Sequence, residues 1–355
     1  MSEPLTVLPT SRVPALADAP TLRWGILSPG WIASMMTEAL QANTGQQVVA
    51  VASRSQQRAE AFAQRYGIER AYGSAEELLA DDGVDAIYIA SPHSEHHRQA
   101  LEVIAAGKPV LVEKAFCRNA AEAHEVVDAA RAAKVPAMEA MWSRFLPQAD
   151  VLRQLVADGA LGEITSLSAD HGQYFEPDAE HRLFNPDLAG GALLDLGIYP
   201  ISFAAMVLGA PQSITARGAS AFTGVDGQAS MLLEHDNGAG TAFALLDTTL
   251  FAKTPTTATV SGTFARVEIP GDFYVPNTLR YVHRDGTELT LDGATCDPGG
   301  PVRGHQGLAY EACHFAALVA EGRLESDLMP LDETVSILVT IDEVRRQLGV
   351  TLPGE

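Results

Sequence analysis

The stretch Pro109-Val110-Leu111-Val112-Glu113-Lys114 decides the fold. Its four apolar residues follow a Gly-Lys turn and are typical of a strand buried on both faces, as in a parallel sheet. In open α/β sheets, ligands bind at the carboxyl ends of the strands, so a lysine delivered there is placed for chemistry. The alternative is a solvated lysine just past a strand end.

Short apolar runs alternate with helical patterns on both sides of this stretch. Strands are predicted over 22–27, 48–53, 85–90, 109–112 and 135–138, and helices near 31–42, 55–66, 94–106 and 119–133. This alternation predicts an α/β fold with a doubly wound (Rossmann) parallel sheet and right-handed crossovers.

The pattern changes after about residue 145. Helices are predicted near 147–158, 192–208, 304–321 and 331–347, and strands over 163–174, 212–221, 228–236, 239–248, 256–261, 265–270, 279–283 and 287–291. Period-two alternation and turn residues predict a C-terminal α+β domain with a large, open, mostly antiparallel sheet. We expect a flexible arm at 1–21, a first domain at 22–145 and a second domain at 146–355, with the option that its final helix packs back on the first domain.

Composition argues against several kinds of partner. The formal net charge of −21 disfavours nucleic acid and anionic membranes, because phosphate binding needs clustered Lys and Arg. No stretch approaches the roughly 18 unbroken apolar residues of a membrane span. The three cysteines are far apart and the ten histidines show no metal-ligand spacing. We therefore expect a cytoplasmic protein without a metal.

The first predicted strand runs into Ser28-Pro29-Gly30-Trp31-Ile32-Ala33. This is a degenerate G-x-G-x-x-G/A fingerprint, in which Gly30 lets backbone approach a pyrophosphate and Ala33 keeps the helix close to the sheet. The helix N-terminus offers N–H groups to phosphate oxygens. An ordinary strand–helix turn is the alternative.

The second predicted strand ends at Ser53 and Arg54, with Arg58 one turn on. NAD enzymes usually carry Asp or Glu near this position for the ribose 2′-hydroxyl. A guanidinium and a hydroxyl suit a 2′-phosphate, so we expect NADP, with NAD as the alternative. The competing interpretation of Arg54 is an exposed arginine at a helix start.

Two further segments are candidates for the site. Ser91-Pro92-His93 follows the strand at 85–90, and His96 could contact cofactor or substrate or only cap or pack its helix. Trp142 and Arg144 lie past the strand at 135–138 and are candidates for a substrate pocket, although a tryptophan there is as often plain packing.

The segment 190–200 reads GGALLDLGIYP. Asp195 and Tyr199 are four apart, so on a helix they share one face, and polar groups amid apolar neighbours need partners or a ligand. An ammonium such as that of Lys114 would lower the pKa of a nearby tyrosine, which makes a Tyr–Lys pair a plausible acid/base device. The alternative is a tyrosine that anchors the helix.

These motifs together resemble the glucose–fructose oxidoreductase/inositol dehydrogenase/rhizopine-catabolism (Gfo/Idh/MocA) family over nearly the whole chain. Tyr199 and the segment 139–147 are similar to the branch of dimeric dihydrodiol dehydrogenases and NADP-dependent D-xylose dehydrogenases. The family usually has Pro after Glu-Lys, where this chain has Ala115. The resemblance implies that Lys114 and Tyr199 are the catalytic pair, that Asp195 contacts substrate hydroxyls or orients the pair, and that the open sheet face forms a dimer or a dimer of dimers.

We therefore expect an NADP-dependent oxidoreductase of a sugar, such as the aldose D-xylose, or of a cyclic trans-diol. Residues 22–145 are the expected NAD(P)-binding domain, and residues 146–355 the expected substrate-binding and dimerisation domain. The expected cofactor-binding set is Ser28, Gly30, Trp31, Ile32, Ala33, Ser53, Arg54, Arg58, Ser91, Pro92, His93, His96, Glu113 and Lys114. The expected substrate-binding set is Trp142, Arg144, Phe175, Asp195 and Tyr199, with His181, Arg182 and Phe184 as candidates from the 174–187 loop. The alternatives are a ketosugar reductase, a cofactor-retaining oxidoreductase and, in a different class, a sensor without turnover.

Overall fold

A computed structural model describes residues 3–238 and 240–355. The chain divides into two compact units. The six-stranded unit comprises residues 14–145 and 297–335, and the eight-stranded unit comprises residues 1–13, 146–296 and 336–355. Residues 297–335 thus join the unit of the parallel sheet, whereas the sequence analysis assigned them to the C-terminal domain.

The six-stranded unit has the predicted doubly wound topology. Its strands are all parallel, in the order β3-β2-β1-β4-β5-β6. The strands are β1 (Arg23–Leu27), β2 (Gln47–Ala52), β3 (Arg70–Tyr72), β4 (Ala86–Ile89), β5 (Val110–Glu113) and β6 (Ala137–Ala140). Strand order reverses between β1 and β4, which is where open α/β sheets bind their ligands.

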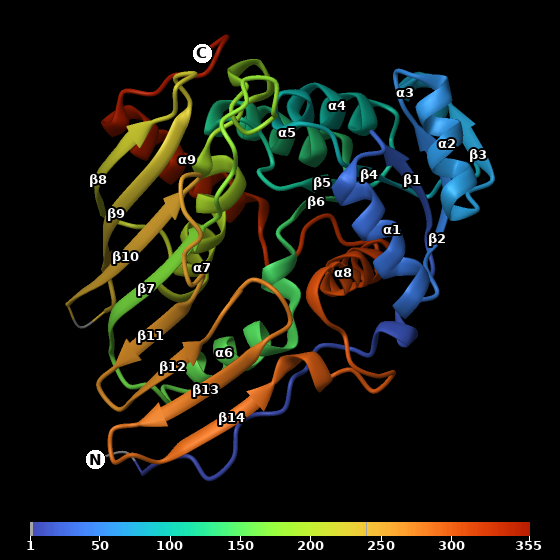
Figure 1. Cartoon of the computed structure of the whole chain (residues 1–355). Helices are drawn as coiled ribbons and strands as arrows, with labels where there is room; N and C mark the ends of the chain where they lie inside the picture. Colours follow the sequence, from blue (N-terminus) through green and yellow to red (C-terminus); the bar gives the residue numbers. More distant parts are fainter. Residues whose placement is uncertain (1–2, 239) are drawn as a thin grey trace. The chain divides into compact units, whose positions relative to one another are not determined.

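Helices cover both faces of this sheet. They are α1 (Trp31–Asn43), α2 (Gln56–Tyr66), α3 (Ala75–Leu79), α4 (His93–Ala105), α5 (Ala120–Ala133) and α8 (Leu308–Ala320), with the 3₁₀ turns η1 (Leu16–Asp18), η2 (Trp142–Phe145) and η6 (Gly304–Gly307). Figure 1 shows α4 and α5 on one face and α1 and α8 on the other. Strand β4 and all but the first residue of β1 are buried along their length, which explains the continuous apolar runs.

The eight-stranded unit is built on a mostly antiparallel sheet, in the order β14-β13-β12-β11-β7-β10-β9-β8. Its strands are β7 (Ile164–Gly172), β8 (Ser213–Ser220), β9 (Asp226–Asp236), β10 (Thr241–Thr249), β11 (Ala258–Gly262), β12 (Ala265–Ile269), β13 (Thr278–His283) and β14 (Glu288–Asp292). Among the described strand pairs of this sheet, β7–β10 is parallel and the others are antiparallel. This confirms the predicted fold class.

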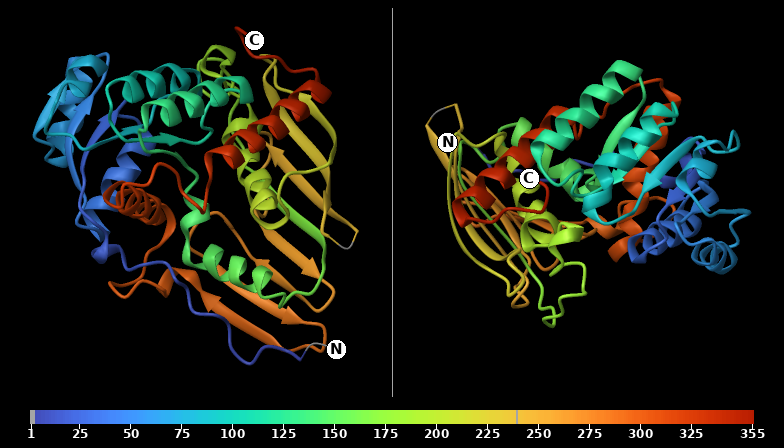
Figure 2. Two further views of the ribbon diagram at one scale, coloured as in Figure 1. Left: turned by 180° about the vertical axis from the view of Figure 1, so that it is seen from behind. Right: turned by 90° about the horizontal axis from the view of Figure 1, so that it is seen from above.

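Helices cover one face of the eight-stranded sheet. They are α6 (Pro147–Ala157), η3 (Pro186–Leu188), the π-helical turn η4 (Leu193–Gly197), α7 (Ile198–Leu208), η5 (Gly293–Thr295) and α9 (Leu331–Leu348), whose first residues belong to the other unit. Figure 2 shows no helix of the described chain against the other face of this sheet. Burial alternates along β10, with Phe243 and Leu245 exposed and Ala244 and Leu246 buried. The sheet therefore has one buried and one open face.

Some details differ from the sequence-based predictions. Strand β3 and helix α3 were not predicted, because three and five residues are too few to show a clear period. The strand predicted at 239–248 begins at residue 239, which lies outside the described residues; β10 starts at Thr241. The segment Pro186–Leu208 is long and apolar enough to cross a membrane by length and composition. However, 78% of its apolar 18-residue stretch is buried in the fold, as in the core helix of a globular domain.

The N-terminal segment, expected to be a flexible arm, makes specific contacts over the residues described from 3 onward. Within the eight-stranded unit, the Arg12 guanidinium pairs with Asp150 at 2.7 Å. Within the six-stranded unit, Leu16 is buried and its N–H donates to Asp297 at 2.9 Å. These contacts hold Arg12 and Leu16, whereas Val7 nearby stays 73% exposed.

Candidate functional site

The turn between β1 and α1 fits a dinucleotide phosphate. Ser28 adopts a positive φ of 74° and its N–H donates to the Ala52 carbonyl at 3.0 Å. A Cβ placed on Gly30 would meet only the Ala90 carbonyl, at 4.0 Å, so the open side of Gly30 leaves room for a ligand. No described side chain caps α1, and its first N–H groups can therefore donate to phosphate oxygens. Ala33 is fully buried, as the fingerprint requires.

Trp31 and Trp142, predicted for cofactor and substrate, share one neighbour in the six-stranded unit. His305 meets the Trp31 ring edge-on at 4.9 Å and stacks on Trp142 at 5.6 Å between centroids. Trp31 is 63% exposed, whereas Trp142 is 2% exposed. The contact favours a packing role for Trp142. His305 was missed by the sequence analysis, because 270 residues separate it from the fingerprint.

The turn after β2 presents two arginines to solvent. Ser55 caps α2 by accepting the Arg58 N–H, and the Ser53 hydroxyl accepts the Ser55 N–H at 3.3 Å. Arg54 and Arg58 are exposed, and neither guanidinium pairs with an acidic side chain in the described ranges. Both can therefore bind an anion without first breaking an ion pair.

The β4–α4 turn is held together internally. Pro92 precedes α4, the Ser91 hydroxyl donates to Gln99 at 2.7 Å, and the His93 ring lies edge-on to His96 at 5.7 Å. Both ring nitrogens of His96 face backbone carbonyls, those of Ser91 at 2.9 Å and Ala115 at 2.8 Å. Burial lowers the pKa of His96. This geometry favours a structural role for His96, and its contact with cofactor stays a prediction.

The pair Glu113-Lys114 lies at the carboxyl end of β5, as predicted. Lys114 is half-buried, and its backbone N–H donates to the Glu113 carboxylate at 3.2 Å. The Tyr88 hydroxyl on β4 donates to the other oxygen of Glu113. The Lys114–Ala115 peptide is cis. Because β5 ends at Glu113, the Lys114 side chain branches from the carboxyl-end edge of the sheet, where open α/β sheets bind their ligands.

The Arg144 side chain is buried and is not exposed to solvent. It lies in η2 and pairs with Glu333 at 2.5 Å. Burial lowers the pKa of Arg144, and the carboxylate of Glu333 opposes this effect. An arginine so paired is costly to expose, which favours a structural role over substrate binding.

In the eight-stranded unit, Asp195 lies in the π-helical turn η4. It is 6% exposed, and both carboxylate oxygens accept bonds from the Arg182 guanidinium, at 3.0 and 3.3 Å. Single π turns in helices are frequent at functional sites. The half-exposed Arg182, one of the loop candidates, therefore orients the carboxylate predicted to contact substrate.

Tyr199 follows η4 in the first turn of α7 and lies against two rings. Its ring is 5.3 Å from that of His171 on β7 and 4.7 Å from that of Tyr274, which itself stacks on His171 at 4.6 Å. Gln173 contacts the His171 imidazole at 3.1 Å. Burial raises the pKa of Tyr274 to about 12, so its hydroxyl stays neutral. The sequence analysis missed His171 and Tyr274, because separate strands and loops bring them to Tyr199.

Two glycines explain why the chain folds this way before η4. A Cβ on Gly190 would lie 2.6 Å from the Leu183 carbonyl, next to Arg182. Gly191 has a φ of +122°, and a Cβ there would lie 2.3 Å from Asp226. Asp226 accepts the Leu193 N–H at 2.6 Å and so holds the start of η4. The Gly-Gly pair thus permits the close approach that brings Arg182 and Asp195 together.

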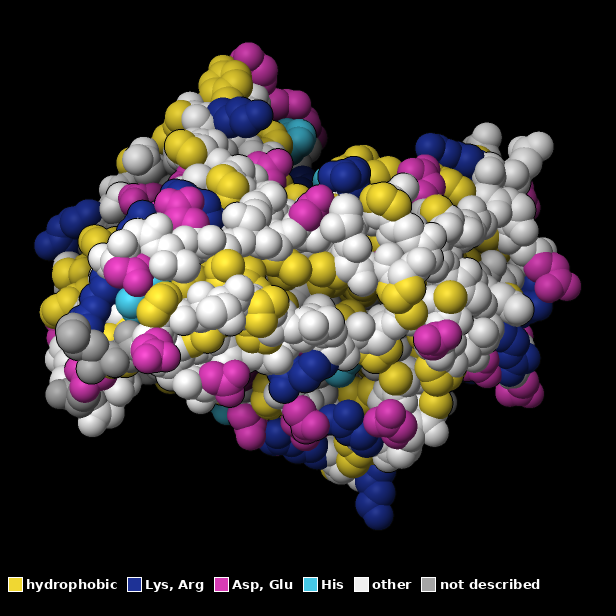
Figure 3. Space-filling model, turned by 90° about the horizontal axis from the view of Figure 1, so that it is seen from below, with side chains coloured by type: hydrophobic (Ala, Val, Ile, Leu, Met, Phe, Trp, Pro, Cys, Tyr) yellow, Lys and Arg dark blue, Asp and Glu magenta, His cyan; other side chains and the backbone are white. Residues whose placement is uncertain are grey.

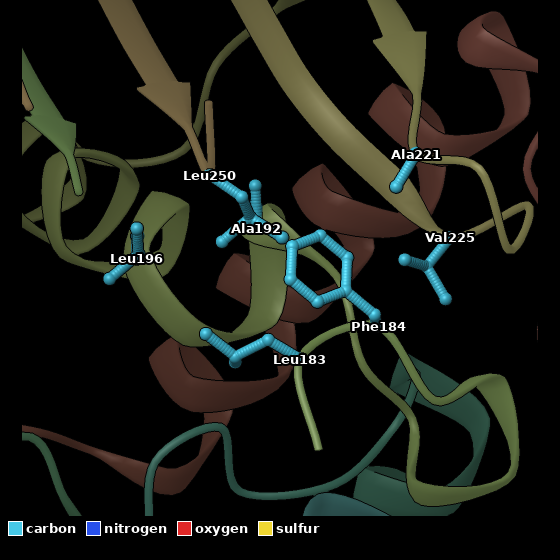
Figure 4. Close-up of a cluster of buried hydrophobic side chains, with 7 residues drawn as sticks. All are labelled: Leu183, Phe184, Ala192, Leu196, Ala221, Val225 and Leu250. Carbon is cyan, nitrogen blue, oxygen red and sulfur yellow. The ribbon is translucent and has the colours of Figure 1, made fainter. Parts of the chain in front are cut away.

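An apolar cluster includes Ala192 and Leu196, two residues of the segment that carries Asp195 (Figure 4). It consists of Leu183, Phe184, Ala192, Leu196, Ala221, Val225 and Leu250. Phe175, predicted to bind substrate, packs partly buried against the cluster, and its ring is 5.7 Å from that of His181. The loop before η4 is therefore anchored through its aromatic side chains.

The predicted site residues thus fall into two sets, one in each unit. Lys114 and the β1–α1 turn belong to the six-stranded unit, and Asp195 and Tyr199 belong to the eight-stranded unit. The pairing of Lys114 with Tyr199 stays a prediction. Among the residues described, no group of three or more His, Cys, Asp and Glu is arranged to hold a metal ion.

Comparison with known proteins identifies the family. Residues 22–141 match the model of the Gfo/Idh/MocA oxidoreductase family with an NAD-binding Rossmann fold, and residues 150–268 match the Gfo/Idh/MocA C-terminal domain. The chain belongs to the Gfo/Idh/MocA family. It is accordingly an NAD(P)-dependent dehydrogenase acting on CH–OH groups.

Curated relatives of this Gfo/Idh/MocA protein match over nearly its full length. It is 38% identical to trans-1,2-dihydrobenzene-1,2-diol dehydrogenase from Mus musculus, over 94% of this chain and 99% of the relative, and 38% identical to the Homo sapiens protein of the same name over the same shares. A solved structure of KijD10, a 3-ketoreductase from Actinomadura kijaniata with NADP and TDP-benzene, is 26% identical with a TM-score of 0.77, covering 92% of this chain and 98% of that one.

Proposed function

We propose that this protein is an NADP-dependent oxidoreductase that moves a hydride between nicotinamide and the hydroxyl-bearing carbon of a cyclic trans-diol or a sugar. The observation that carries this proposal is the 38% identity, over 94% of the chain, to a dehydrogenase named for a cyclic trans-diol. The placement of Asp195 and Tyr199 in consecutive helical turns supports it.

The nicotinamide dinucleotide supplies the hydride chemistry when it is bound. During oxidation the Tyr199 phenolate takes the proton of the substrate hydroxyl and becomes a neutral phenol. The Lys114 ammonium favours the phenolate form of Tyr199 and binds the same substrate oxygen. Asp195, held by Arg182, accepts a hydrogen bond from the second hydroxyl of the substrate, which fixes the orientation of the diol.

The preference for NADP rests on Ser53, Arg54 and Arg58. Beyond β2, two guanidiniums that pair with no acidic side chain among the described residues suit a 2′-phosphate, whereas an NAD site would carry a carboxylate there. The structure with NADP of the 26% identical relative is consistent with this assignment.

A substrate screen tests the function directly. Reduction of NADP and of NAD is followed at 340 nm with trans-1,2-dihydrobenzene-1,2-diol, other trans-diols, D-xylose, other aldoses and inositols. We expect turnover with a trans-diol or an aldose. The variant Tyr199→Phe should lower kcat by about 10²- to 10⁴-fold while NADP still binds, because it removes the general acid–base group. Tyr174→Phe, an exposed tyrosine of the same unit, is the matched control.

Three outcomes would contradict parts of this proposal. An unchanged kcat in Tyr199→Phe removes Tyr199 from the mechanism. Turnover only in the direction of NADPH oxidation with ketosugars favours the ketosugar reductase, to which the similarity to a 3-ketoreductase lends weight. Absence of turnover on the whole panel, with cofactor bound, favours a sensor.

We further propose a cytoplasmic homodimer, or dimer of dimers, joined through the open face of the eight-stranded sheet. The exposed side chains of Phe243 and Leu245 on β10 support this choice of face. Figure 3 shows basic side chains interspersed with acidic ones on the surface it presents, which is consistent with a small-molecule substrate rather than a nucleic acid or membrane partner.

A further inference from the structure

Three buried side chains hold the backbone of the tripeptide Lys114-Ala115-Phe116. The Lys114 N–H donates to Glu113 at 3.2 Å, the Ala115 carbonyl lies 2.8 Å from a ring nitrogen of His96, and the Phe116 N–H donates to Glu139 at 3.1 Å. Glu113, His96 and Glu139 are 5%, 0% and 0% exposed. Ionisable groups are rarely buried without a specific role.

We propose that Glu113, His96 and Glu139 are positioning residues that fix the backbone of Lys114 so that its side chain starts from one place and one direction. This proposal rests on the proposed function, in which the Lys114 ammonium acts on Tyr199 and on the substrate oxygen. None of the three needs to contact substrate or cofactor.

The three contacts come from three different elements. Glu113 ends β5, His96 lies on α4, and Glu139 lies on β6, opposite Val112 in the β5–β6 register. Glu113 is itself held by the Tyr88 hydroxyl from β4. A rotation of the backbone at residues 114–116 would break at least one buried hydrogen bond, at a cost of about 1–3 kcal/mol for each group left unpaired.

A third buried glutamate, Glu311 on α8, is close enough to Glu113 and Glu139 to feel their charges. It is 0% exposed, and among the residues that the structure describes neither of its carboxyl oxygens has a hydrogen-bond partner. Burial, reinforced by the charges of Glu113 and Glu139, raises the pKa of Glu311 well above its ordinary value. A neutral Glu311 adds no negative charge to a site that already holds two carboxyls, which explains how α8 can pack there.

Holding the backbone matters because the lysine side chain is long. Lysine carries its charge on a flexible four-carbon stem. A misplacement of about 1 Å at a reacting group can cost about 100-fold in rate. Fixing the root of the stem removes a large part of this freedom before substrate arrives.

Two substitutions at Glu139 separate positioning from mere packing. Glu139→Leu removes the acceptor of the Phe116 N–H at similar volume, and we expect kcat to fall about 10- to 100-fold while KM and the Kd for NADP change less than about threefold. Glu139→Gln keeps an acceptor oxygen and should recover most of the lost kcat. Equal kcat in wild type and a folded Glu139→Leu overturns the proposal, as does a loss that Gln does not recover.

A second readout does not depend on turnover. The chain has four lysines, at 108, 114, 134 and 253, so reductive methylation with [¹³C]formaldehyde gives a simple NMR spectrum in which Lys114→Arg assigns the Lys114 signal. We expect Glu139→Leu to shift or broaden that signal and to leave those of the exposed Lys134 and Lys253 in place. An unmoved Lys114 signal overturns the proposal.

Tyr88→Phe is the second variant if Glu139→Leu does not fold. This variant deletes the hydroxyl that holds Glu113, and it should lower kcat about tenfold and move the Lys114 signal. If neither kcat nor the Lys114 signal changes, the proposal is overturned. Lys114→Ala separates the two hypotheses. If it keeps full kcat, the proposed catalytic role of Lys114 fails and the NMR signal alone decides positioning. If it loses kcat while a folded Glu139→Leu does not, positioning alone fails.

Discussion

Arg54 is the residue on which the choice of cofactor depends. It lies just past β2, exposed, and no acidic side chain of the described chain pairs with it. An arginine that must first break an ion pair with a carboxylate contributes little net free energy to phosphate binding. Arg54 has no such ion pair with a described residue to break. Its contribution should therefore appear almost entirely in the affinity for the 2′-phosphate.

Replacing Arg54 by Ala should weaken NADP binding about 10- to 100-fold and NAD binding less than about threefold, since a hydrogen bond to a charged group contributes about 1.5–3 kcal/mol. Titration of the intrinsic tryptophan fluorescence measures both values of Kd. Arg65→Ala, in the last turn of the helix α2 that follows Arg54, is the control. Equal losses for NADP and NAD would disprove the 2′-phosphate assignment.

Sequence alone identified the residues that belong to local motifs. Lys114 at a strand end, the Gly30 turn and the Asp195/Tyr199 spacing are all readable within about ten residues. Arg182, His171 and Tyr274 could not be assigned roles, because loops and strands far apart in the sequence bring them to Asp195 and Tyr199. Sequence does not show that Arg144 and His96 are buried with partners inside the fold, so it left their roles open; their contact with ligands stays a prediction.

Among the elements, the π-helical turn η4 depends most on its surroundings. A π turn is rare and needs support from neighbours, which here come from the Asp226 carboxylate and the apolar cluster. Gly191 lies where that support begins. The two-glycine sequence marked this turn as special, but period and propensity predicted an ordinary helix over 192–208.

Gly191→Ala should lower the free energy of unfolding by about 2 kcal/mol or more, because it combines an unfavourable φ with a contact to Asp226 that a Cβ cannot make. Gly224→Ala is the matched control: its φ is +92°, yet a Cβ there meets nothing within 4 Å. It should cost only about 1 kcal/mol. Urea unfolding followed by circular dichroism compares the two, and equal losses would show that the contact with Asp226 contributes nothing.

At the scale of the whole molecule, each unit carries a buried acid that resists ionisation. Burial raises the pKa of Asp226 from 3.8 to about 7 and that of Glu139 from 4.5 to about 7. The stability that such an acid contributes is complete below its unfolded pKa and is lost as pH rises through the folded value. Stability should therefore fall between about pH 4 and pH 8.

Asp226→Asn should flatten this decline in the eight-stranded unit by about 1–3 kcal/mol between pH 5 and pH 8, because an amide keeps an acceptor for Leu193 and does not ionise. Thermal unfolding across that range measures it. Asp285→Asn is the control of opposite sign: the pKa of Asp285 is lowered to about 2, chiefly by the Thr287 N–H, so its contribution is lost only in acid. An unchanged slope in Asp226→Asn would refute the assignment.

The open sheet face makes a prediction about assembly. Leu245→Glu should convert a dimer into a monomer of 37.7 kDa, because it places a charge in the middle of the proposed interface. Light scattering after gel filtration gives the mass. Val339→Glu on α9 is equally exposed, 51% against 52%, and should leave the mass unchanged. A monomeric wild type would disprove the dimer.

The division of the chain has a consequence for how the protein is made. Trp24 on β1 packs against Phe315 on α8, so the six-stranded unit takes one of its covering helices from near the end of the sequence. A ribosome that has released residues 14–145 has not yet delivered that helix. One face of the sheet in the nascent chain therefore stays partly uncovered until residues 308–320 have been synthesised, and exposed apolar surface of this kind favours aggregation during folding.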